Sequence, residues 1–248
     1  MRKFGLIGFP LGHSFSEKYF REKFARESIS GCHYGNYEMA SVSGLPDLLK
    51  DADLEGLNVT IPYKEAVIPF LDKKDPVVEQ TGACNCILIR KGLLTGFNTD
   101  VIGFEESLTA KLAPQDKHAL ILGTGGSSKA VAWVLTKKGI DFLYVSRKKT
   151  DSPDQISYQD LDQKILKSHS LIINCTPLGM FPNTDQFPPI DYGGIGPEHY
   201  LFDLIYNPEK TLFLAKGEAA GARIKNGADM LVIQAEASWA IWNHPSGQ

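Results

Sequence analysis

A glycine-rich run between two regular elements constrains the fold of this chain more than any other feature. The apolar residues Leu120 to Leu122 are followed by Gly-Thr-Gly-Gly-Ser-Ser, which ends at Ser128, and then by a helical pattern up to Lys138. A strand, a tight glycine turn and a helix N-terminus in this order are typical of dinucleotide-binding folds, because free N–H groups of the helix donate to a pyrophosphate. The alternative is a plain glycine-rich turn, since Ser128 replaces the third glycine of the usual pattern.

The end of the next predicted strand indicates which dinucleotide would bind. Enzymes that use NAD commonly carry an acidic residue there, whereas this chain has Ser146, Arg147, Lys148 and Lys149. A guanidinium can hold a phosphate with two parallel hydrogen bonds, so Arg147 suits a 2′-phosphate. The pattern favours NADP over NAD, with a solvated basic turn as the alternative.

The remaining chain alternates short apolar runs with helical segments, which predicts an α/β protein with mostly parallel sheets. A second series of strands and helices begins near residue 103. We expect a hairpin over 83–97 at one edge of the first sheet, a helix that starts at Pro62, and a loop over 181–197. The other expected strands are 4–9, 33–39, 54–59, 118–122, 142–146, 171–175 and 200–205, and the expected helices are 16–28, 101–112, 129–138 and 228–242.

The last of these helices carries a polar residue on its apolar face. Gln234 falls on the stripe that we predict to be buried, so its amide must find a buried partner or face a ligand. The apolar members of that predicted stripe are Met230, Ile233, Ala237, Ala240 and Ile241.

Charge and hydropathy exclude several classes of function. The net charge is −3 and charged residues make up 22% of the chain, so no basic surface indicates a nucleic acid partner. No segment approaches the ~20 apolar residues of a membrane span, and the apolar run near the N-terminus is too short for a signal peptide. We therefore expect a soluble, cytoplasmic protein without a membrane partner.

The cysteine spacing does not indicate a metal site. The four cysteines are Cys32, Cys84, Cys86 and Cys175, and the paired spacing of zinc ligands is absent. Cys84 and Cys86 would share one face if both lay in a strand. We expect buried, reduced thiols and no metal.

Polar segments follow the predicted strands of the N-terminal half. They span residues 8–16, 58–64, 82–85 and 96–100. Ligands bind α/β sheets at the carboxyl ends of strands, so these segments are candidates for one site. Taken singly, Ser16, Thr60 and Asp100 have a simpler interpretation as helix caps, and Lys64 as a surface charge.

Together these segments resemble the shikimate dehydrogenase family. The family carries Gly-x-Pro…His-Ser-x-Ser, Asn-Val-Thr-x-Pro-x-Lys, Gly-Ala-x-Asn and Asn-Thr-Asp-x-x-Gly in that order, and all four occur here. Further matches cover residues 174–180 and 203–208, and then Asn226, Gly227 and Gln234. The resemblance thus spans nearly the whole chain.

The resemblance implies an activity and a set of site residues. The activity is the NADPH-dependent, reversible reduction of 3-dehydroshikimate to shikimate, a step of aromatic amino acid (chorismate) biosynthesis. Lys64 and Asp100 are implied as the catalytic acid–base pair. The implied substrate contacts are Ser14, Ser16, Thr60, Asn85, Tyr206 and Gln234. The implied cofactor contacts are Gly123, Thr124, Gly125, Gly126, Ser127, Ser128, Ser146, Arg147, Thr176, Gly227 and Met230.

General chemistry agrees with these roles. Reduction of a ketone places negative charge on the carbonyl oxygen, and a cation such as Lys64 stabilises that charge and supplies a proton. Asp100 can hold the ammonium in place. The hydroxyl and amide side chains suit the carboxylate and hydroxyls of the substrate.

The resemblance also implies an architecture of two domains. We expect a substrate-binding and catalytic domain at 1–102, an NADP-binding Rossmann domain at 103–224, and a C-terminal helix within 225–248 that returns to the first domain. The active cleft would lie between the domains, and the protein would be a monomer or a homodimer.

Three alternatives accompany this interpretation. The residue after Asn85 is usually Thr in the family and is Cys86 here, which predicts a looser contact with the polyol and leaves a quinate/shikimate dehydrogenase with broader substrate or NAD use as the first alternative. The second is a non-catalytic nucleotide-binding sensor, against which the presence of both Lys64 and Asp100 argues. The third is a two-domain enzyme of the methylenetetrahydrofolate dehydrogenase type, which lacks the His-Ser-x-Ser and Asn-Val-Thr-x-Pro-x-Lys stretches found here.

Overall fold

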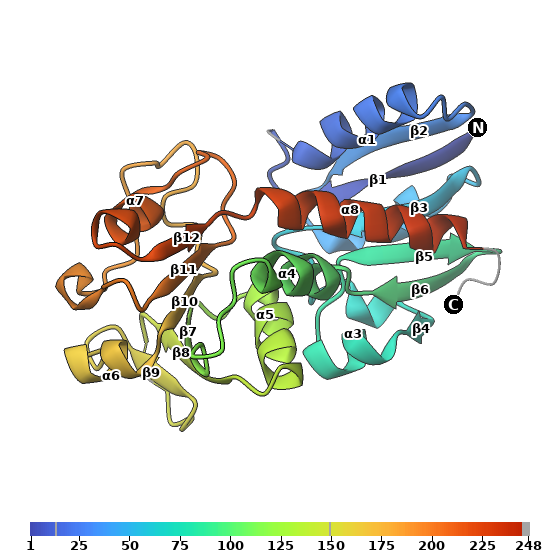
Figure 1. The fold of residues 1–248 in the computed structure, drawn as a ribbon. Helices are drawn as coiled ribbons and strands as arrows, with labels where there is room; N and C mark the ends of the chain where they lie inside the picture. The colour runs from blue at the N-terminus through green and yellow to red at the C-terminus, as the bar shows by residue number, and fades with distance from the viewer. Residues whose placement is uncertain (13, 149, 245–248) are drawn as a thin grey trace. The chain divides into compact units, whose positions relative to one another are not determined.

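The structure is a computed structural model that describes residues 1–12, 14–148 and 150–244 (Figure 1). It forms two compact units, one made of residues 1–102 and the segment from Gln234 onward, the other of residues 103–233. Each unit contains one six-stranded sheet. The boundary on the C-terminal side falls inside the last helix, so residues 225–233 lie in the second unit.

The sheet of the first unit is mixed, with the order β2-β1-β3-β5-β6-β4. Strand β1 pairs in parallel with β2 and β3, whereas β5 runs antiparallel to both β3 and β6. The strands are β1 (Arg2–Gly8), β2 (Cys32–Glu38), β3 (Leu54–Val59), β4 (Lys73–Lys74), β5 (Cys86–Arg90) and β6 (Leu93–Phe97).

The predicted hairpin is present, but it does not form the edge of the sheet. Lys91 and Gly92 join β5 to β6, and their φ angles of 51° and 76° are those required of a two-residue type I′ turn. The two-residue strand β4 pairs in parallel with β6 on the outer side. Two exposed lysines give no apolar pattern, which is why the sequence did not indicate this strand.

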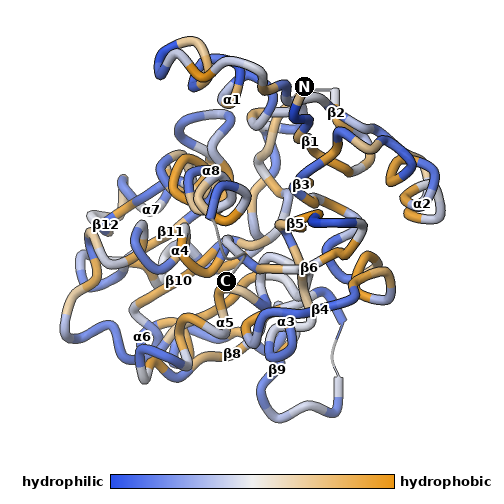
Figure 2. The backbone as a smooth tube through the Cα atoms, turned by 90° about the vertical axis from the view of Figure 1, so that its right-hand side faces the viewer, coloured by the Kyte–Doolittle hydropathy of each residue, from blue (hydrophilic) through white to orange (hydrophobic). Residues whose placement is uncertain are grey.

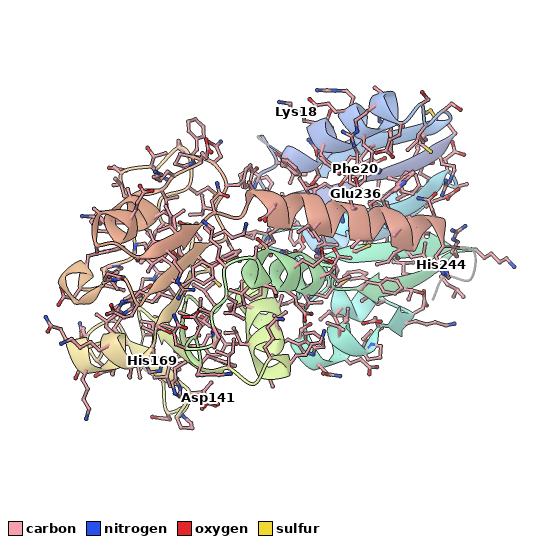
Figure 3. The ribbon with its side chains drawn as sticks, viewed as in Figure 1. Lys18, Phe20, Asp141, His169, Glu236 and His244 are labelled. Carbon is pink, nitrogen blue, oxygen red and sulfur yellow. The ribbon has the colours of Figure 1, made fainter. Side chains whose placement is uncertain are left out.

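Helices cover both faces of the first sheet. On one face α1 (Phe15–Arg26) and α8 (Ala228–Asn243) pack through Phe20 and Trp242 onto β1. Lys23 of α1 pairs with Glu236 of α8 at 2.8 Å, and Figure 3 labels Phe20 and Glu236 on these two helices. The opposite face packs against the short helices α2 (Leu45–Leu48) and α3 (Pro76–Thr81), and against the 3-10 turns Val42–Gly44 and Ile68–Phe70.

The sheet of the second unit is entirely parallel, with the order β12-β11-β10-β7-β8-β9. Its central strands are apolar (Figure 2), and every residue of β10 is buried. The strands are β7 (His118–Leu122), β8 (Asp141–Ser146), β9 (Gln155–Ser157), β10 (Leu171–Asn174), β11 (Tyr200–Asp203) and β12 (Arg223–Lys225). Adjacent parallel strands joined by helical crossovers make this a Rossmann-like sheet.

Helices also cover the second sheet. Leu166 of α6 and Phe213 of α7 belong to the cluster on one face, while Phe104 of α4 meets Phe202 of β11 edge to face on the other. The bounds are α4 (Asp100–Thr109), α5 (Gly126–Lys137), α6 (Gln163–Ser168) and α7 (Leu212–Ala219), with a 3-10 turn at Tyr192–Gly194 inside the predicted loop. The α/β class and the two-sheet architecture predicted from the sequence are confirmed. In the part of the chain that the structure describes, no helix combines the length and apolarity needed to cross a bilayer.

The helix expected to begin at Pro62 is not formed. Residues 61–67 make successive turns. The carbonyl of Lys64 accepts the N–H of Cys84 at 2.7 Å, so it is not available to Ile68, whose N–H bonds Glu65 instead. Pro69 has no N–H to continue the ladder. A tertiary hydrogen bond thus replaces the first helical turn.

The buried face of α8 also differs from the predicted one. Ala240 is exposed, and Ala237 is only partly buried. Trp242 is fully buried and stacks on Phe4 with a centroid separation of 4.9 Å, and this large side chain sets the rotation of the helix. The buried residues of α8 in the first unit are Gln234, Ala235, Ser238 and Trp242.

Candidate active site

Two oppositely charged residues form the centre of the candidate site. Lys64 lies in the turns after β3, and Asp100 begins α4 three residues after the end of β6. The Lys64 Nζ lies 2.6 Å from Asp100 Oδ2, and the two side chains are only 13% and 8% exposed. A buried lysine and carboxylate at this distance form a strong, charge-assisted hydrogen bond that holds the ammonium in one place.

Asn85 fixes the other side of the carboxylate. It lies just before β5, and its Nδ2 is 2.8 Å from Asp100 Oδ1 and 3.4 Å from Gln234 Oε1. Both oxygens of Asp100 are therefore used by side chains, which is a different role from that of a helix cap. The structure brings together Lys64, Asn85, Asp100 and Gln234, four residues that the sequence places far apart.

The predicted hydroxyl residues lie on neighbouring segments of the same unit. Ser14 precedes α1, but its side chain makes no capping bond, and its buried Oγ has no hydrogen-bond partner among the described residues. Ser16 lies in the first turn of α1. Thr60 directly follows β3 and is half-buried. His13, which belongs to the same sequence motif as Ser14, lies outside the described residues.

Ser16 is connected to a buried tyrosine. Burial raises the pKa of Tyr34 well above its ordinary value, and a hydrogen bond with Ser16 opposes part of that rise. The Tyr34 hydroxyl donates to Asn58 Oδ1 at 2.9 Å. Asn58 is 4% exposed and lies in β3, two residues before Thr60.

Sequence reasoning missed three buried polar residues of this site, namely Asn58, Thr99 and Ser238. Thr99 is 1% exposed, and its Oγ1 lies 3.0 Å from Asn85 Nδ2. Ser238 is completely buried one helical turn after Gln234. That spacing of four residues from an already selected polar residue was a signal that could have identified Ser238.

The glycine turn of the second unit has the geometry of a nucleotide cradle. Gly123 has a φ of +104°, and a Cβ there would lie 3.0 Å from Thr176 Cγ2. A Cβ at Gly125, by contrast, would meet no atom within 4 Å. Helix α5 begins at Gly126, so its N-terminus lies beside the open space at Gly125. The residues present therefore fit a bound pyrophosphate.

The other residues of this turn are arranged around that space. Thr124 lies between the two glycines, and Ser127 lies in the first turn of α5. Ser128 is buried, and its Oγ donates to the carbonyl of Gly125 at 2.6 Å. The serine that replaces the third glycine thus ties the turn to the helix.

A buried acid supports the loop that carries Thr176. Asn174 Oδ1 accepts from Thr176 Oγ1 at 2.6 Å, and Asn174 Nδ2 donates to Asp203 Oδ1 at 3.0 Å. Burial raises the pKa of Asp203 to about 6, although hydrogen bonds from Thr211, Ile205 and Asn174 oppose the rise. Asn174 and Asp203 were not among the predicted site residues, although both lie in segments that carry the family resemblance.

The basic residue predicted for the 2′-phosphate is accessible. Arg147 is exposed at the end of β8, directly after Ser146, whose Oγ donates to the carbonyl of Lys148 at 2.6 Å. That bond spans Arg147 just after the end of β8. Lys149, the last residue of the basic run, lies outside the described residues.

Three more predicted contacts belong to the second unit. Tyr206 is half-buried, and burial raises its pKa. A Cβ at Gly227 would collide with the carbonyl of Leu204, so only glycine fits there. Met230 is 7% exposed in the first turn of α8.

The cysteines form no metal site in the structure. All four are free, and among the described residues no three His, Cys, Asp or Glu side chains gather as metal ligands. Cys84 and Cys86 do not share a face, because β5 begins only at Cys86. Cys84 packs in the cluster on one side of the sheet and Cys86 in the cluster on the other.

Known proteins resemble this chain over nearly its whole length. The sequence model of the shikimate dehydrogenase substrate binding domain matches residues 6–87. The shikimate dehydrogenase (NADP(+)) of Desulforamulus reducens is 33% identical over 96% of this chain and 88% of its own length. The crystal structure of shikimate dehydrogenase 1 from Peptoclostridium difficile is 37% identical, with a TM-score of 0.84 over 98% of this chain and 91% of that chain.

A second solved structure was determined with ligands. The shikimate 5-dehydrogenase of Thermus thermophilus, in complex with NADP(H) and shikimate, is 28% identical and has a TM-score of 0.87 over 100% of this chain and 97% of that chain. Identity above 30% to a curated relative along almost the whole chain shows the family. The chain belongs to the shikimate dehydrogenase family.

Proposed function

We propose that this chain is an enzyme that interconverts 3-dehydroshikimate and shikimate with NADP as its cofactor. The observation that carries the proposal is the Lys64–Asp100 pair, held at 2.6 Å and braced by Asn85. Both residues follow strands of the unit that contains the family's substrate-binding segment. A buried cation with a fixed orientation is what reduction of a ketone to an alcohol requires.

The residues of the first unit would act on the carbonyl oxygen and its proton. NADPH, when bound, supplies the hydride. The ammonium of Lys64 donates a hydrogen bond to the carbonyl oxygen, stabilises its developing negative charge and delivers the proton. Asp100 orients the ammonium, and Asn85 orients Asp100. In the reverse direction the same pair accepts the proton of the substrate hydroxyl.

The remaining polar side chains would hold the substrate. The Ser14 Oγ is buried without a partner among the described residues, and a buried hydroxyl of this kind gains a bond when a carboxylate or hydroxyl arrives. We assign Ser16, Thr60 and Gln234 to binding of the substrate as well. Tyr206 would contact the substrate near the carbon that is oxidised or reduced. These contacts would fix the ring in a reactive orientation.

We further propose that the first unit acts as the substrate-binding domain and the second as the NADP-binding domain. The N-terminus of α5 and the space at Gly125 would receive the pyrophosphate, and Arg147 the 2′-phosphate. Thr176, Gly227 and Met230 would contact the nicotinamide half.

A cytoplasmic location is part of this proposal, because all four cysteines are free, as in proteins of reducing compartments. Whether the protein is a monomer or a homodimer stays a prediction.

Oxidation of quinate is the nearest alternative activity, and Cys86 was its sequence argument. In the structure Cys86 is completely buried within the aromatic cluster that contains Phe20 and Trp242. The thiol therefore packs in the core, and the looser polyol contact expected from the sequence does not follow from Cys86.

The experiment that tests the proposal follows the absorbance of reduced nicotinamide. The purified protein is mixed with shikimate or quinate and with NADP or NAD in all four combinations. We expect a fast rise with shikimate and NADP and much slower ones in the other mixtures. A faster reaction with quinate or NAD would replace the proposal with the alternative, and no reaction in any mixture, from protein that binds NADP, would refute catalysis on these substrates.

A further inference from the structure

One buried hydroxyl joins β3, the residue that precedes α4, and α8. Ser238 is completely buried on α8. Its Oγ lies 2.9 Å from Asn58 Nδ2, 3.1 Å from Thr99 Oγ1 and 2.9 Å from the carbonyl oxygen of Gln234. A serine hydroxyl can donate once and accept twice, so these three contacts use its whole capacity.

The neighbouring groups determine the direction of each bond. Asn85 Nδ2 donates to Thr99 Oγ1 at 3.0 Å, and Asn85 Oδ1 already accepts the backbone N–H of Thr99 at 2.6 Å. The Thr99 Oγ1 lies 3.2 Å from Asn85 Oδ1 and 3.1 Å from Ser238 Oγ, so its proton can go to either oxygen. Because Ser238 donates its own proton to the carbonyl of Gln234, Ser238 is an acceptor for Thr99. Asn58 donates its second amide proton to the carbonyl of Asn85, at 3.3 Å.

Each partner of Ser238 adjoins a residue with a proposed role in the reaction. Thr99 precedes Asp100 in the chain and contacts Asn85. Asn58 is two residues before Thr60, on the strand that leads to Lys64. Ser238 therefore links β3, the start of α4 and α8 through one oxygen atom.

The network also reaches β2. Tyr34 donates to Asn58 Oδ1 at 2.9 Å. A continuous series of hydrogen bonds thus runs from Tyr34 through Asn58 and Ser238 to the residues that hold Asp100. Ser238 is the member of this series that connects Asn58 on β3 to Thr99 beside Asp100.

We propose that Ser238 is a positioning residue of the reaction, one that aligns Asn85 and Asp100 through Thr99 and fixes β3 through Asn58. The inference rests on the proposed function. Replacement of Ser238 by Ala leaves the Asn58 amide and the Thr99 hydroxyl without their buried acceptor, so both groups reorient toward other partners. A shift of roughly 1 Å in a catalytic group can lower a rate about 100-fold.

The test compares Ser238→Ala with a control that loosens the same helix elsewhere. The hydroxyl of Tyr19 on α1 donates to Glu236, two residues before Ser238 on α8, and takes no part in the network. Tyr19→Phe therefore removes one hydroxyl that anchors α8 and leaves the catalytic side untouched. For wild type and both variants we would measure kcat, KM for each substrate, and the kinetic isotope effect with NADPH deuterated at the transferred position.

We expect Ser238→Ala to lower kcat about 10- to 100-fold, with an unchanged KM for NADPH and a larger isotope effect, because hydride transfer then limits the rate. Tyr19→Phe should keep the kcat and the isotope effect of wild type. A kcat of Ser238→Ala within twofold of wild type, or an equal loss in Tyr19→Phe, would overturn the proposal.

A second variant keeps the test decisive if Ser238→Ala does not fold. Thr99→Val has nearly the same shape but no hydroxyl to donate to Ser238, and it should lower kcat and raise the isotope effect in the same direction. An unchanged kcat in Thr99→Val would overturn the inference. Failure of the proposed function looks different, because wild type itself would then not oxidise NADPH with 3-dehydroshikimate.

Discussion

The candidate substrate site of the first unit and the nucleotide turn of the second are built in opposite ways. In the first, side chains satisfy one another: both oxygens of Asp100 have partners in Lys64 and Asn85. In the second, the space around the turn is unfilled, because a Cβ at Gly125 would meet no atom within 4 Å. Arg147 of the same unit is exposed. One site is held in shape by its own residues, while the other leaves open space beside a helix N-terminus.

Because of this difference, we expect substitutions in the two sites to have different consequences. A network in which buried side chains bond one another loses alignment when one member is truncated, because its partners become unsatisfied. A cradle of backbone N–H groups depends little on its side chains and strongly on the space that glycine leaves. Substitutions in the first unit should therefore act on the chemical step, and those in the second on cofactor affinity.

The largest expected effect comes from breaking the charged pair of the first unit. Lys64→Ala removes the proton donor and should lower kcat by roughly 10²- to 10⁴-fold, while the dissociation constant of shikimate changes little. Lys73→Ala is the matched control, since Lys73 is an exposed lysine of the same unit. Steady-state rates and calorimetric titration measure the two quantities, and wild-type turnover in Lys64→Ala would refute the assigned role.

A smaller effect should follow from the exposed arginine of the second unit. Arg147→Ala is expected to raise KM for NADP about 10- to 100-fold, the size of lost charge-assisted bonds, and to leave KM for NAD nearly unchanged. Arg147→Lys keeps the charge without the planar fork and should fall between wild type and Arg147→Ala. Equal losses with both cofactors would show that Arg147 does not read the 2′-phosphate.

The smallest effects distinguish the two glycines of the turn. Gly123→Ala forces a side chain into a left-handed conformation against Thr176, and should lower the free energy of unfolding by about 1–3 kcal/mol. Gly125→Ala meets no protein atom, so its unfolding free energy should stay close to that of wild type while its affinity for NADP falls. If Gly125→Ala bound NADP normally, the open space would not be the pyrophosphate site. Chemical denaturation and NADP titration provide both measurements.

The sequence predicted those parts of the fold that local patterns determine. Strand β7 consists largely of a continuous apolar run, and its predicted bounds agree with the structure. The predicted bounds of β3 agree as well. The helix at Pro62 was wrong because a hydrogen bond between Lys64 and Cys84, 20 residues apart, replaces the helical turn. Contacts of this kind leave no periodic signal along the chain.

The candidate site shows the same division. Motifs identified Lys64, Asn85, Asp100 and Gln234, which the structure brings together. They did not identify Ser238, because the rotation of α8 depends on where Trp242 packs against Phe4. Apolar residues lie on several sides of α8, so the sequence alone does not determine which side is buried. The buried face was therefore predicted about one residue out of phase.

Deuterium transfer would show whether the alcohol bound by residues of the first unit gives its hydride to the dinucleotide bound by the second unit. Shikimate deuterated at the carbon that bears the 3-hydroxyl is oxidised with NADP, and the NADPH formed is analysed by mass spectrometry. We predict that the label appears in NADPH and that Lys64→Ala forms almost none. Label released to solvent, or no NADPH formed by wild type, would contradict the account.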